Sequence, residues 1–354
     1  MTGAIRALLG DRNENLREKI TSVYALLILF NIAAWVWAFI AFRDYPLLMG
    51  TSLLAYSFGL RHAVDADHIA AIDNVTRKLM QAGQRPVTVG LMFSLGHSTI
   101  VVLASVGIAA TALALQGHFE SWKEIGGLIG TLVSTCFLFA IALMNLVILR
   151  SVVHAFGRVR RGEPYAEEDF DLLLGNRGFL TRLFRPMFRL VTRSWHMYFL
   201  GFLFGLGFDT ATEVGLLGMS AAGAAHGMSI WSILVFPALF TAGMTLVDTT
   251  DGILMLGAYG WAFVKPIRKL YYNITITSIS VIVAVVVGSI EGLGLIGDKL
   301  HLNGAFWDVV GMLNDNFGLV GYGIIAVFIA SWLASALIYK IKRFDETGAN
   351  AESV

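Results

Sequence analysis

The sequence predicts an all-α polytopic membrane protein with eight transmembrane helices, and three observations support this fold class. Of 354 residues, 56% are hydrophobic and only 14% are charged, whereas a soluble domain has about 25% charged residues. Apolar stretches of about 20 residues, the length that a helix needs to cross the hydrocarbon core, recur along the chain. The 26 Lys and Arg residues lie mostly between these stretches. The net charge of +1 is uninformative, because what matters is where the charges lie. We expect a lipid bilayer as the surroundings and no nucleic-acid partner.

Eight apolar segments are the predicted spans. The first, fourth and last are continuous and apolar, whereas the second, third, fifth and sixth contain ionisable or polar residues and several glycines. Their approximate bounds are 23–42, 47–70, 87–115, 125–149, 197–220, 230–258, 272–296 and 319–339.

The distribution of Lys and Arg predicts the orientation, because these residues concentrate in cytoplasmic loops. With a cytoplasmic N-terminus, the outer loops contain only Arg43, Lys123 and Lys299, and Arg61 lies within a span. All other basic residues then face the cytoplasm, including those of the 77–85 loop. We therefore expect both termini to be cytoplasmic.

The spans divide the chain into five parts. We expect a cytoplasmic leader, a first transmembrane half with spans one to four, a basic cytoplasmic loop, a second half with spans five to eight, and a cytoplasmic tail. These are residues 1–22, 23–149, 150–196, 197–340 and 341–354. Cys136 is the only cysteine, which excludes an intrachain disulfide and a cysteine metal cluster.

Short matches indicate an internal repeat that relates spans one to three with spans four to six. Phe58-Gly59-Leu60 in span two matches Phe204-Gly205-Leu206 in span five, and the segment 93–98 in span three matches 240–245 in span six. Because the two halves are offset by three spans, they must run in opposite directions through the membrane. Inverted repeats with glycine-interrupted helices are typical of transporters, and the binding site usually lies between the repeats.

Ionisable residues cluster at the end of the second span, where they are costly and therefore indicate function. They are His62, Asp65, Asp67 and His68, and span three adds His97. In a regular helix, His62, Asp65 and His68 face one arc of roughly 120°. Asp67 then points elsewhere, where it would orient a histidine, or it joins the site if the helix is unwound.

Imidazole and carboxylate groups together suit a divalent transition metal such as nickel, cobalt, zinc, copper or iron. Oxygen-only sites for magnesium or calcium do not need three histidines. The alternative is a set of interhelical hydrogen bonds, which is less economical for five ionisable residues in two neighbouring spans. We expect a transported ion here, and no cofactor.

A second polar cluster lies in spans five and six. Asp209 and Glu213 are one turn apart on span five, as are Asp248 and Asp251 on span six. They are candidates for an exit path or gate of oxygen ligands, or for salt bridges to Arg61; packing hydrogen bonds are the alternative. In span one, Asn31 is the only strongly polar side chain, and it approaches the site or makes an interhelical contact.

The run RHAVDADHI at 61–69 resembles the signature of the nickel/cobalt transporter family (NiCoT), whose core is a His, four residues and Asp-His. Three further stretches are similar to the family's motifs, in the same order: FSLGHSTIVV at 93–102, LGFDTATEV at 206–214 and GMTLVDTTDGILM at 243–255. The resemblance covers nearly the whole chain and is greatest to bacterial high-affinity nickel permeases.

The resemblance implies eight spans and high-affinity uptake of Ni²⁺, Co²⁺ or both. It implies that His62, Asp65, Asp67 and His68 matter for transport. In the family, the first span and the motif of the second influence the choice between nickel and cobalt. Asn31 and Val64 are therefore candidates for selectivity.

The leading hypothesis is a secondary permease that imports Ni²⁺. No G-x-x-x-x-G-K-[ST] loop occurs, and we expect no obligatory ATPase subunit. A metal exporter, or a subunit that needs an ATPase, remains an alternative. An enzyme of the H-x₄-D acyltransferase type is less favoured, since His68 directly follows Asp67 and no basic phosphate-binding segment follows.

Overall fold

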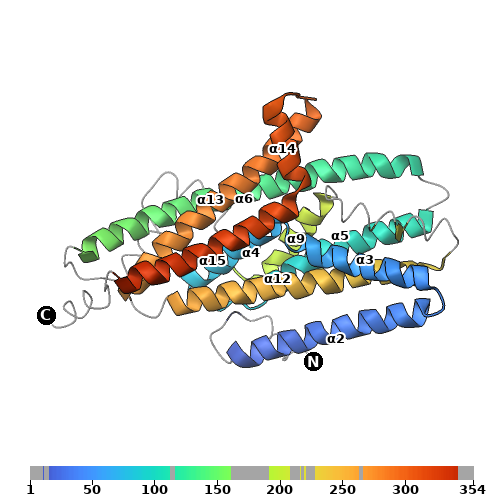
Figure 1. The fold of residues 1–354 in the computed structure, drawn as a ribbon, viewed down its shortest axis with the longest axis horizontal. Helices are drawn as coiled ribbons and strands as arrows, with labels where there is room; N and C mark the ends of the chain where they lie inside the picture. Colours follow the sequence, from blue (N-terminus) through green and yellow to red (C-terminus); the bar gives the residue numbers. More distant parts are fainter. Residues whose placement is uncertain are drawn as a thin grey trace.

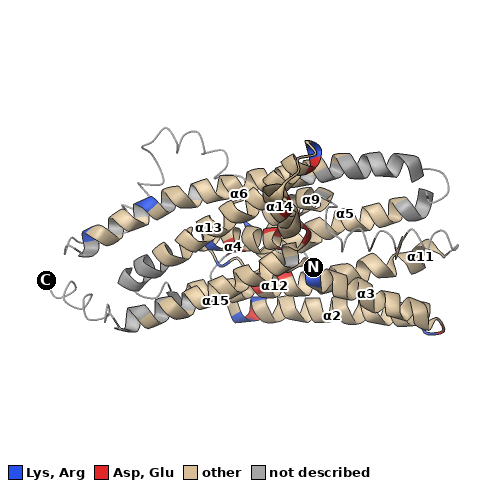
Figure 2. Ribbon diagram, turned by 45° about the horizontal axis from the view of Figure 1, so that its top comes forward, with Lys and Arg blue, Asp and Glu red and all other residues tan. Residues whose placement is uncertain are grey.

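The computed structural model describes residues 11, 16–111, 116–160, 191–207, 216, 219–220, 228–262 and 266–341. All regular elements in these ranges are helices, and the long ones lie side by side along the long axis of the molecule (Figure 1). The prediction of an all-α protein is confirmed for this part of the chain. Figure 2 shows long stretches of the described helices without Lys, Arg, Asp or Glu.

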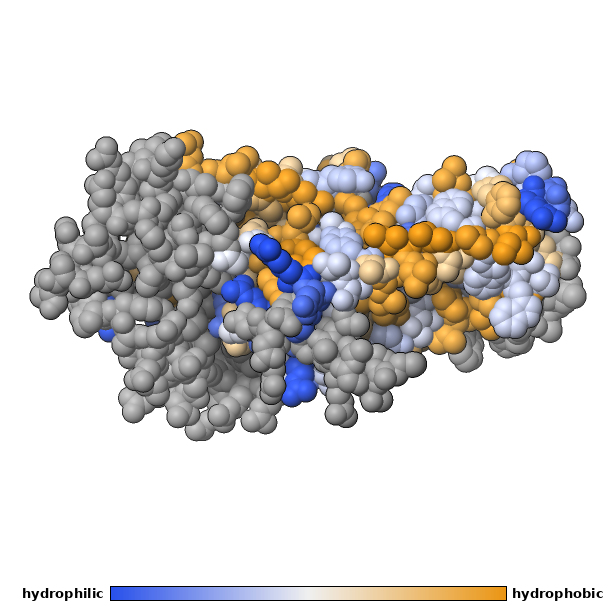
Figure 3. Space-filling view, turned by 90° about the horizontal axis from the view of Figure 1, so that it is seen from below, coloured by the Kyte–Doolittle hydropathy of each residue, from blue (hydrophilic) through white to orange (hydrophobic). Residues whose placement is uncertain are grey.

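The apolar exterior is clearest on α2 (Leu16–Phe42), which corresponds to the first predicted span. One side of this helix is buried through Val23, Leu27, Ala34 and Ala38. Its other side leaves large apolar side chains exposed, with Ile40 70% exposed. The described part of the face in Figure 3 is likewise mostly apolar. Such a surface suits lipid and not water.

Five described helices are long and apolar enough to cross a membrane, or six if one bent pair counts as a single span. The five are Leu16–Phe42, Val89–Gly107, Thr131–Arg158, Ile230–Gly260 and Ile274–Lys299. The bent pair is Ala305–Asp315 with Leu319–Ser331, at an angle of 79°. The chain is therefore a multi-pass membrane protein.

The predicted fifth span, 197–220, is described mainly over its first residues. A short 3₁₀ helix, η1 (Ser194–His196), precedes α9 (Met197–Phe204), and η2 (Gly205–Gly207) follows it. Most of the rest of this span lies outside the described residues.

The second predicted span is two helices. α3 (Pro46–His62) begins with a proline in its first turn and ends at His62, and α4 (Ala66–Gln81) begins after Asp65. The expectation of a regular helix through residues 62–68 is therefore wrong. Asp65 is the N-cap of α4, with an extended backbone (ψ 146°), and Asp is among the residues preferred at that position. Asp67 in the first turn of α4 complements the positive end of the helix.

α4 also extends beyond the predicted second span. The helix continues to Gln81, and Arg77 is fully buried in it, whereas the charge pattern assigned Arg77 to a cytoplasmic loop. α6 (Gln116–Arg160) likewise continues into the segment that was predicted as the 150–196 loop.

The remaining helices complete a bundle around α4. They are α5 (Val89–Thr111), α11 (Ile230–Ile233), α12 (Val235–Ala262), α13 (Pro266–Lys299), α14 (Ala305–Asp315) and α15 (Phe317–Ile341). α4 contacts α5, α6, α12, α13 and α15, so its side chains are almost all buried. This position explains why an ionisable helix lies in the middle of a membrane protein.

Glycines bring pairs of helices into backbone contact around α4. A Cβ on Gly59 of α3 would overlap the backbone of Phe240 on α12, and a Cβ on Gly201 of α9 would overlap that of Phe93 on α5. A Cβ on Gly90 would likewise overlap the backbone of Asp248, which fixes α5 against α12. These contacts hold α3 against α12, α9 against α5 and α5 against α12.

Candidate metal centre

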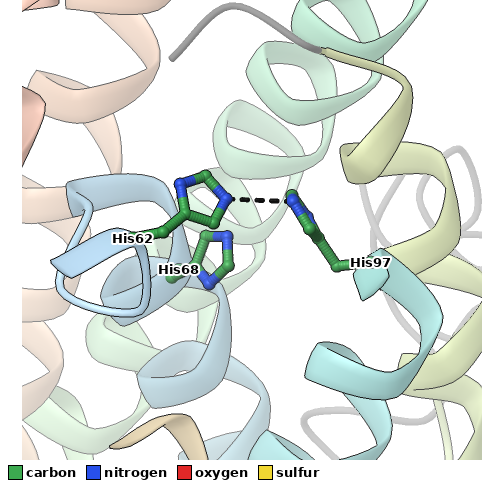
Figure 4. Close-up of side chains that lie close together, drawn as sticks. All are labelled: His62, His68 and His97. Atoms are coloured by element: carbon green, nitrogen blue, oxygen red, sulfur yellow. Dashed lines mark hydrogen bonds between the residues drawn. The ribbon is translucent and has the colours of Figure 1, made fainter. Parts of the chain in front are cut away.

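Three imidazole rings meet at the break between α3 and α4. His62 comes from the last turn of α3, His68 from the first turn of α4, and His97 from α5 (Figure 4). Each offers a ring nitrogen, and these nitrogens lie within 4.8 Å of one another. The ring centroids are 4.7 Å apart for His62 and His68, 4.8 Å for His62 and His97, and 4.9 Å for His68 and His97.

The three histidines are shielded from solvent. His62 is 2% exposed, His68 0% and His97 3%. Aromatic side chains surround them, since Phe240 lies against His62 and Phe93 against His68. In such an apolar setting each polar nitrogen needs a hydrogen-bond partner or a bound ion. Because water is excluded, the electrostatic attraction between a bound cation and its ligands would be screened only weakly.

Asp65 orients the first histidine. Its Oδ2 lies 2.9 Å from Nδ1 of His62. Because an ionised carboxylate only accepts hydrogen bonds, Nδ1 of a neutral His62 carries the proton and Nε2 keeps its lone pair. Nε2 of His62 is 2.9 Å from Nε2 of His97, so His97 donates the hydrogen bond between the two rings. A metal with bonds of about 2.1 Å to both atoms at about 90° would need a similar separation.

Asp248 on α12 orients the second histidine. Its two oxygens lie 3.2 and 3.4 Å from Nδ1 of His68, and Ser94 on α5 donates a hydrogen bond of 2.6 Å to the same carboxylate. The pair is completely buried. Nδ1 of His68 is therefore the donor, and the lone pair of Nε2 is free of that contact. Histidines that bind metals commonly donate their second ring nitrogen to a carboxylate in this way.

The other residues of the signature run lie around this centre. Asp67 is partly buried and is not a member of the three-histidine cluster. Arg61 is exposed, and no ion pair connects it to a described carboxylate. Val64 is 8% exposed and packs through its carbonyl against Gly321 of α15.

The remaining candidates divide into three groups. Asn31 joins α2 to its neighbours: it accepts a hydrogen bond from Tyr56 and donates one to the carbonyl of Ala242. Asp251 is partly buried, one turn beyond Asp248, and its Oδ2 has no hydrogen-bond partner among the described residues. Asp209 and Glu213 lie outside the described residues.

A second buried polar layer follows on α4. Asp73 accepts hydrogen bonds from Tyr259 of α12 and Ser280 of α13, and one turn further along lies the buried Arg77. The sequence analysis did not identify this layer. The available signal was the run IDNVTRK, in which ionisable residues continue at helical spacing after the motif.

The arrangement can bind a divalent transition-metal ion. Three buried imidazoles supply nitrogen ligands, and two of them are held by carboxylates in the tautomer that metal binding requires. The carboxylates also offset the charge of the ion. This donor set is typical of nickel, cobalt, copper, zinc or iron and not of magnesium or calcium.

Comparison with known proteins identifies the family to which the chain belongs. A family described as high-affinity nickel-transport proteins matches residues 48–338 of the chain. The chain belongs to this family. No solved structure matches the chain.

Several curated relatives are similar to this chain over most of their length. A "High-affinity nickel transport protein" of Cupriavidus necator is 64% identical over 95% of both chains. "Hydrogenase nickel incorporation protein HupN" of Bradyrhizobium diazoefficiens is 55% identical over 89% of this chain and 82% of its own length. "Cobalt transport protein NhlF" of Rhodococcus rhodochrous is 39% identical over 92% of this chain and 94% of its own.

Proposed function

We propose that this chain is a secondary permease that imports Ni²⁺ with high affinity across the inner membrane of a bacterium. The observation that carries the proposal is the cluster of three buried histidines from α3, α4 and α5, whose ring nitrogens lie within 4.8 Å. In this proposal His62, His68 and His97 bind the ion directly. Membership of the nickel-transport family and the names of the relatives support nickel as the substrate.

The membrane potential is a sufficient driving force for import. Moving two positive charges inward is worth about 4.6 kcal/mol per 100 mV, which corresponds to a concentration ratio of more than about a thousandfold. No ATPase partner is needed in this scheme. The ion would lose its hydration shell at the buried centre and exchange it for imidazole nitrogens.

Each acidic residue of the site has a proposed part. Asp65 and Asp248 orient His62 and His68 and offset the charge of the ion. Asp67, at the start of α4, would attract the ion towards the centre. Asp251 lies one turn beyond Asp248, where it would accept the ion on its way out. Among the more distant candidates, we keep Asp209 and Glu213 as gate residues, and Asn31, Arg61 and Val64 as residues that line or tune the path.

The proposed topology has eight spans with both termini in the cytoplasm. The leader 1–22, the halves 23–149 and 197–340, the basic loop 150–196 and the tail 341–354 complete it. Five described helices and one bent pair supply six of these spans by length and composition. The pair α3 and α4 would form a seventh, broken at the metal centre, as discontinuous helices do in other transporters.

We also propose the inverted repeat, and the glycine contacts support it. Gly59 of α3 meets Phe240 of α12 as Gly201 of α9 meets Phe93 of α5. The rings continue the pattern, since His62 lies 5.5 Å from Phe240 and Phe204 lies 5.3 Å from Phe93. In this register Gly59 corresponds to Gly201, one turn before the Gly205 that the sequence match selects.

Co²⁺ is a second candidate substrate. The relative from Rhodococcus rhodochrous is named a cobalt transport protein, and imidazole ligands suit both ions. Export, an ATPase-dependent subunit and an acyltransferase activity are the alternatives. In the structure, Nδ1 of His62 lies 2.9 Å from Oδ2 of Asp65, and Asp65 is not the aspartate of the H-x₄-D pattern.

The test is uptake of ⁶³Ni by cells that lack their own nickel importer and express this chain alone. We expect accumulation that His62→Ala and His68→Ala abolish. His154→Ala is the control, since His154 is an exposed histidine on α6 outside the cluster. Normal uptake by the His62 and His68 variants would refute the proposed site, and loss of preloaded ⁶³Ni would indicate export.

A further inference from the structure

The polar layer behind the metal centre contains a completely buried arginine. Arg77 is 0% exposed and is the largest fully buried side chain among the described residues. Its guanidinium donates hydrogen bonds to Asn74 (3.0 Å) and to Thr277 of α13 (3.1 Å). Both partners are neutral. Among the residues that the structure describes, Nε has no hydrogen-bond partner and no carboxylate lies close enough to Arg77 for an ion pair.

Simple helix packing does not require this charge. Asn74 is already hydrogen-bonded to Asn145 of α6 at 2.6 Å and to a carbonyl of its own helix, so neutral groups alone connect α4 to α6. A buried guanidinium within a membrane-spanning region is expensive. Its presence calls for an electrostatic role that a neutral side chain could not fill.

Carboxylates on α4 and α12 couple Arg77 electrostatically to the metal centre. Asp73, one turn before Arg77, interacts electrostatically with it. Asp251 interacts with both Asp73 and Asp248, and Asp248 interacts with Asp65 and with His62 and His97 of the centre. The metal centre and Arg77 therefore interact electrostatically with the same set of interior carboxylates.

The charges of this interior balance differently with and without the transported ion. When all four are ionised, Asp65, Asp73, Asp248 and Asp251 contribute four negative charges, and Arg77 is the one permanent positive charge among the buried side chains that the structure describes. With neutral histidines, a divalent ion would bring the sum from three negative charges to one. Without Arg77, the same ion would meet four negative charges.

We infer that Arg77 is a fixed counter-cation, which competes with the transported divalent ion for the same carboxylates and so limits how tightly the centre holds it. This inference rests on the proposed function. A permease must release its ion as well as bind it. Without a counter-cation, three imidazoles and four carboxylates would bind the ion so tightly that it would dissociate too slowly for transport. Arg77 is nine residues after His68, or about 13.5 Å along the helix. At that distance its repulsion of a divalent ion corresponds to a change in affinity on the order of tenfold to a hundredfold.

The experiment measures equilibrium binding of ⁶³Ni to the purified full-length protein in detergent, together with uptake into proteoliposomes. In Arg77→Gln we expect nickel to bind on the order of tenfold to a hundredfold more tightly, and maximal uptake to fall because release is slower. Arg77→Lys keeps the charge and should bind nickel as the unmodified protein does. Thr277→Val removes one hydrogen bond to the guanidinium but no charge, so it should lower thermal stability and leave affinity unchanged.

Two outcomes would overturn the inference. One is an unchanged or weaker affinity in a folded Arg77→Gln protein, because a purely structural arginine could only loosen the site when it is removed. The other comes from Asp251→Asn, which removes a negative charge without a hydrogen bond and keeps the test open if Arg77→Gln does not fold. Asp251→Asn should weaken nickel binding, and an unchanged affinity would contradict the charge balance. If the unmodified protein binds no nickel, and His62→Ala is no different, the proposed function itself is wrong.

Discussion

The contact between Asp248 and His68 gives the sharpest prediction about the metal centre. Asp248→Asn preserves the size of the side chain and its ability to accept a hydrogen bond, but it removes the negative charge behind His68. We expect nickel to bind more weakly and half-maximal uptake to require a higher nickel concentration. The reason is that the carboxylate fixes the ring and makes its Nε2 a stronger ligand.

The magnitude follows from the geometry. Loss of a carboxylate that supports a metal-binding histidine typically costs 10- to 100-fold in affinity, or about 1.4–2.7 kcal/mol. Both side chains are 0% exposed, so water does not screen their interaction. The hydrogen bond of 2.6 Å from Ser94 also holds the carboxylate in place. We therefore expect a loss near the upper end, about 100-fold.

The assay is ⁶³Ni binding to purified protein, with uptake kinetics in cells as a second measurement. Thr249→Val is the matched control, because Thr249 is the adjacent buried residue on α12 and its hydroxyl has no hydrogen-bond partner among the described residues. The control should bind nickel normally. An Asp248→Asn protein that is folded and binds nickel as tightly as the control would refute the orienting role of this carboxylate.

Two further predictions concern packing and ion choice. Gly59→Ala would drive a methyl group into the backbone of Phe240. We therefore expect a lower melting temperature in detergent, equivalent to a loss of about 1–3 kcal/mol or more of stability. The control is Gly257→Ala, which should melt at the temperature of the unmodified protein because Gly257 has open space around it. Excess Co²⁺ should inhibit ⁶³Ni uptake and excess Mg²⁺ should not, because three imidazoles suit the former ion and not the latter; strong inhibition by Mg²⁺ would mean that oxygen ligands dominate the site.

The membrane class and the location of the site could be predicted from the sequence because both depend on local composition. A chain with 14% charged residues cannot cover a water-facing surface. Within it, His62, His68 and His97 are conspicuous, and the structure brings all three together. The three histidines come from two consecutive predicted spans, and consecutive spans usually pack against each other in the folded protein.

The helix break was not predicted, for a physical reason. No glycine or proline lies between His62 and Ala66, and the residues there are compatible with a continuous helix. At the break, Asp65 occupies the N-cap position through its backbone, without a side-chain hydrogen bond to α4, while its side chain bonds His62. Helix propensity does not reveal that one residue, Asp65, is both the N-cap of α4 and the hydrogen-bond partner of the His62 ring. Both roles follow from the folded geometry.

Long-range partners and the buried arginine were also beyond local patterns. His68 and Asp248 are 180 positions apart, so only the packing of α12 against α4 reveals the contact. Arg77 follows an apolar segment and precedes other basic residues, and the charge rule therefore assigned it to a loop. The rule describes the average distribution of charge across a membrane, and it does not account for a guanidinium that faces the interior of the bundle.

The three proposed ligands belong to the first half of the chain, whereas the carboxylate behind His68 belongs to the second. In the proposed repeat, Phe204 takes the place of His62, so the second half cannot bind a metal in the same way. The second half instead supplies Asp248, on a helix that packs directly on α3, α4 and α5. A movement that separates α12 from α4 would break the contact of His68 with Asp248 and weaken metal binding at the same step. In the proposed permease, this asymmetry would couple a separation of α12 from α4 to release of the ion.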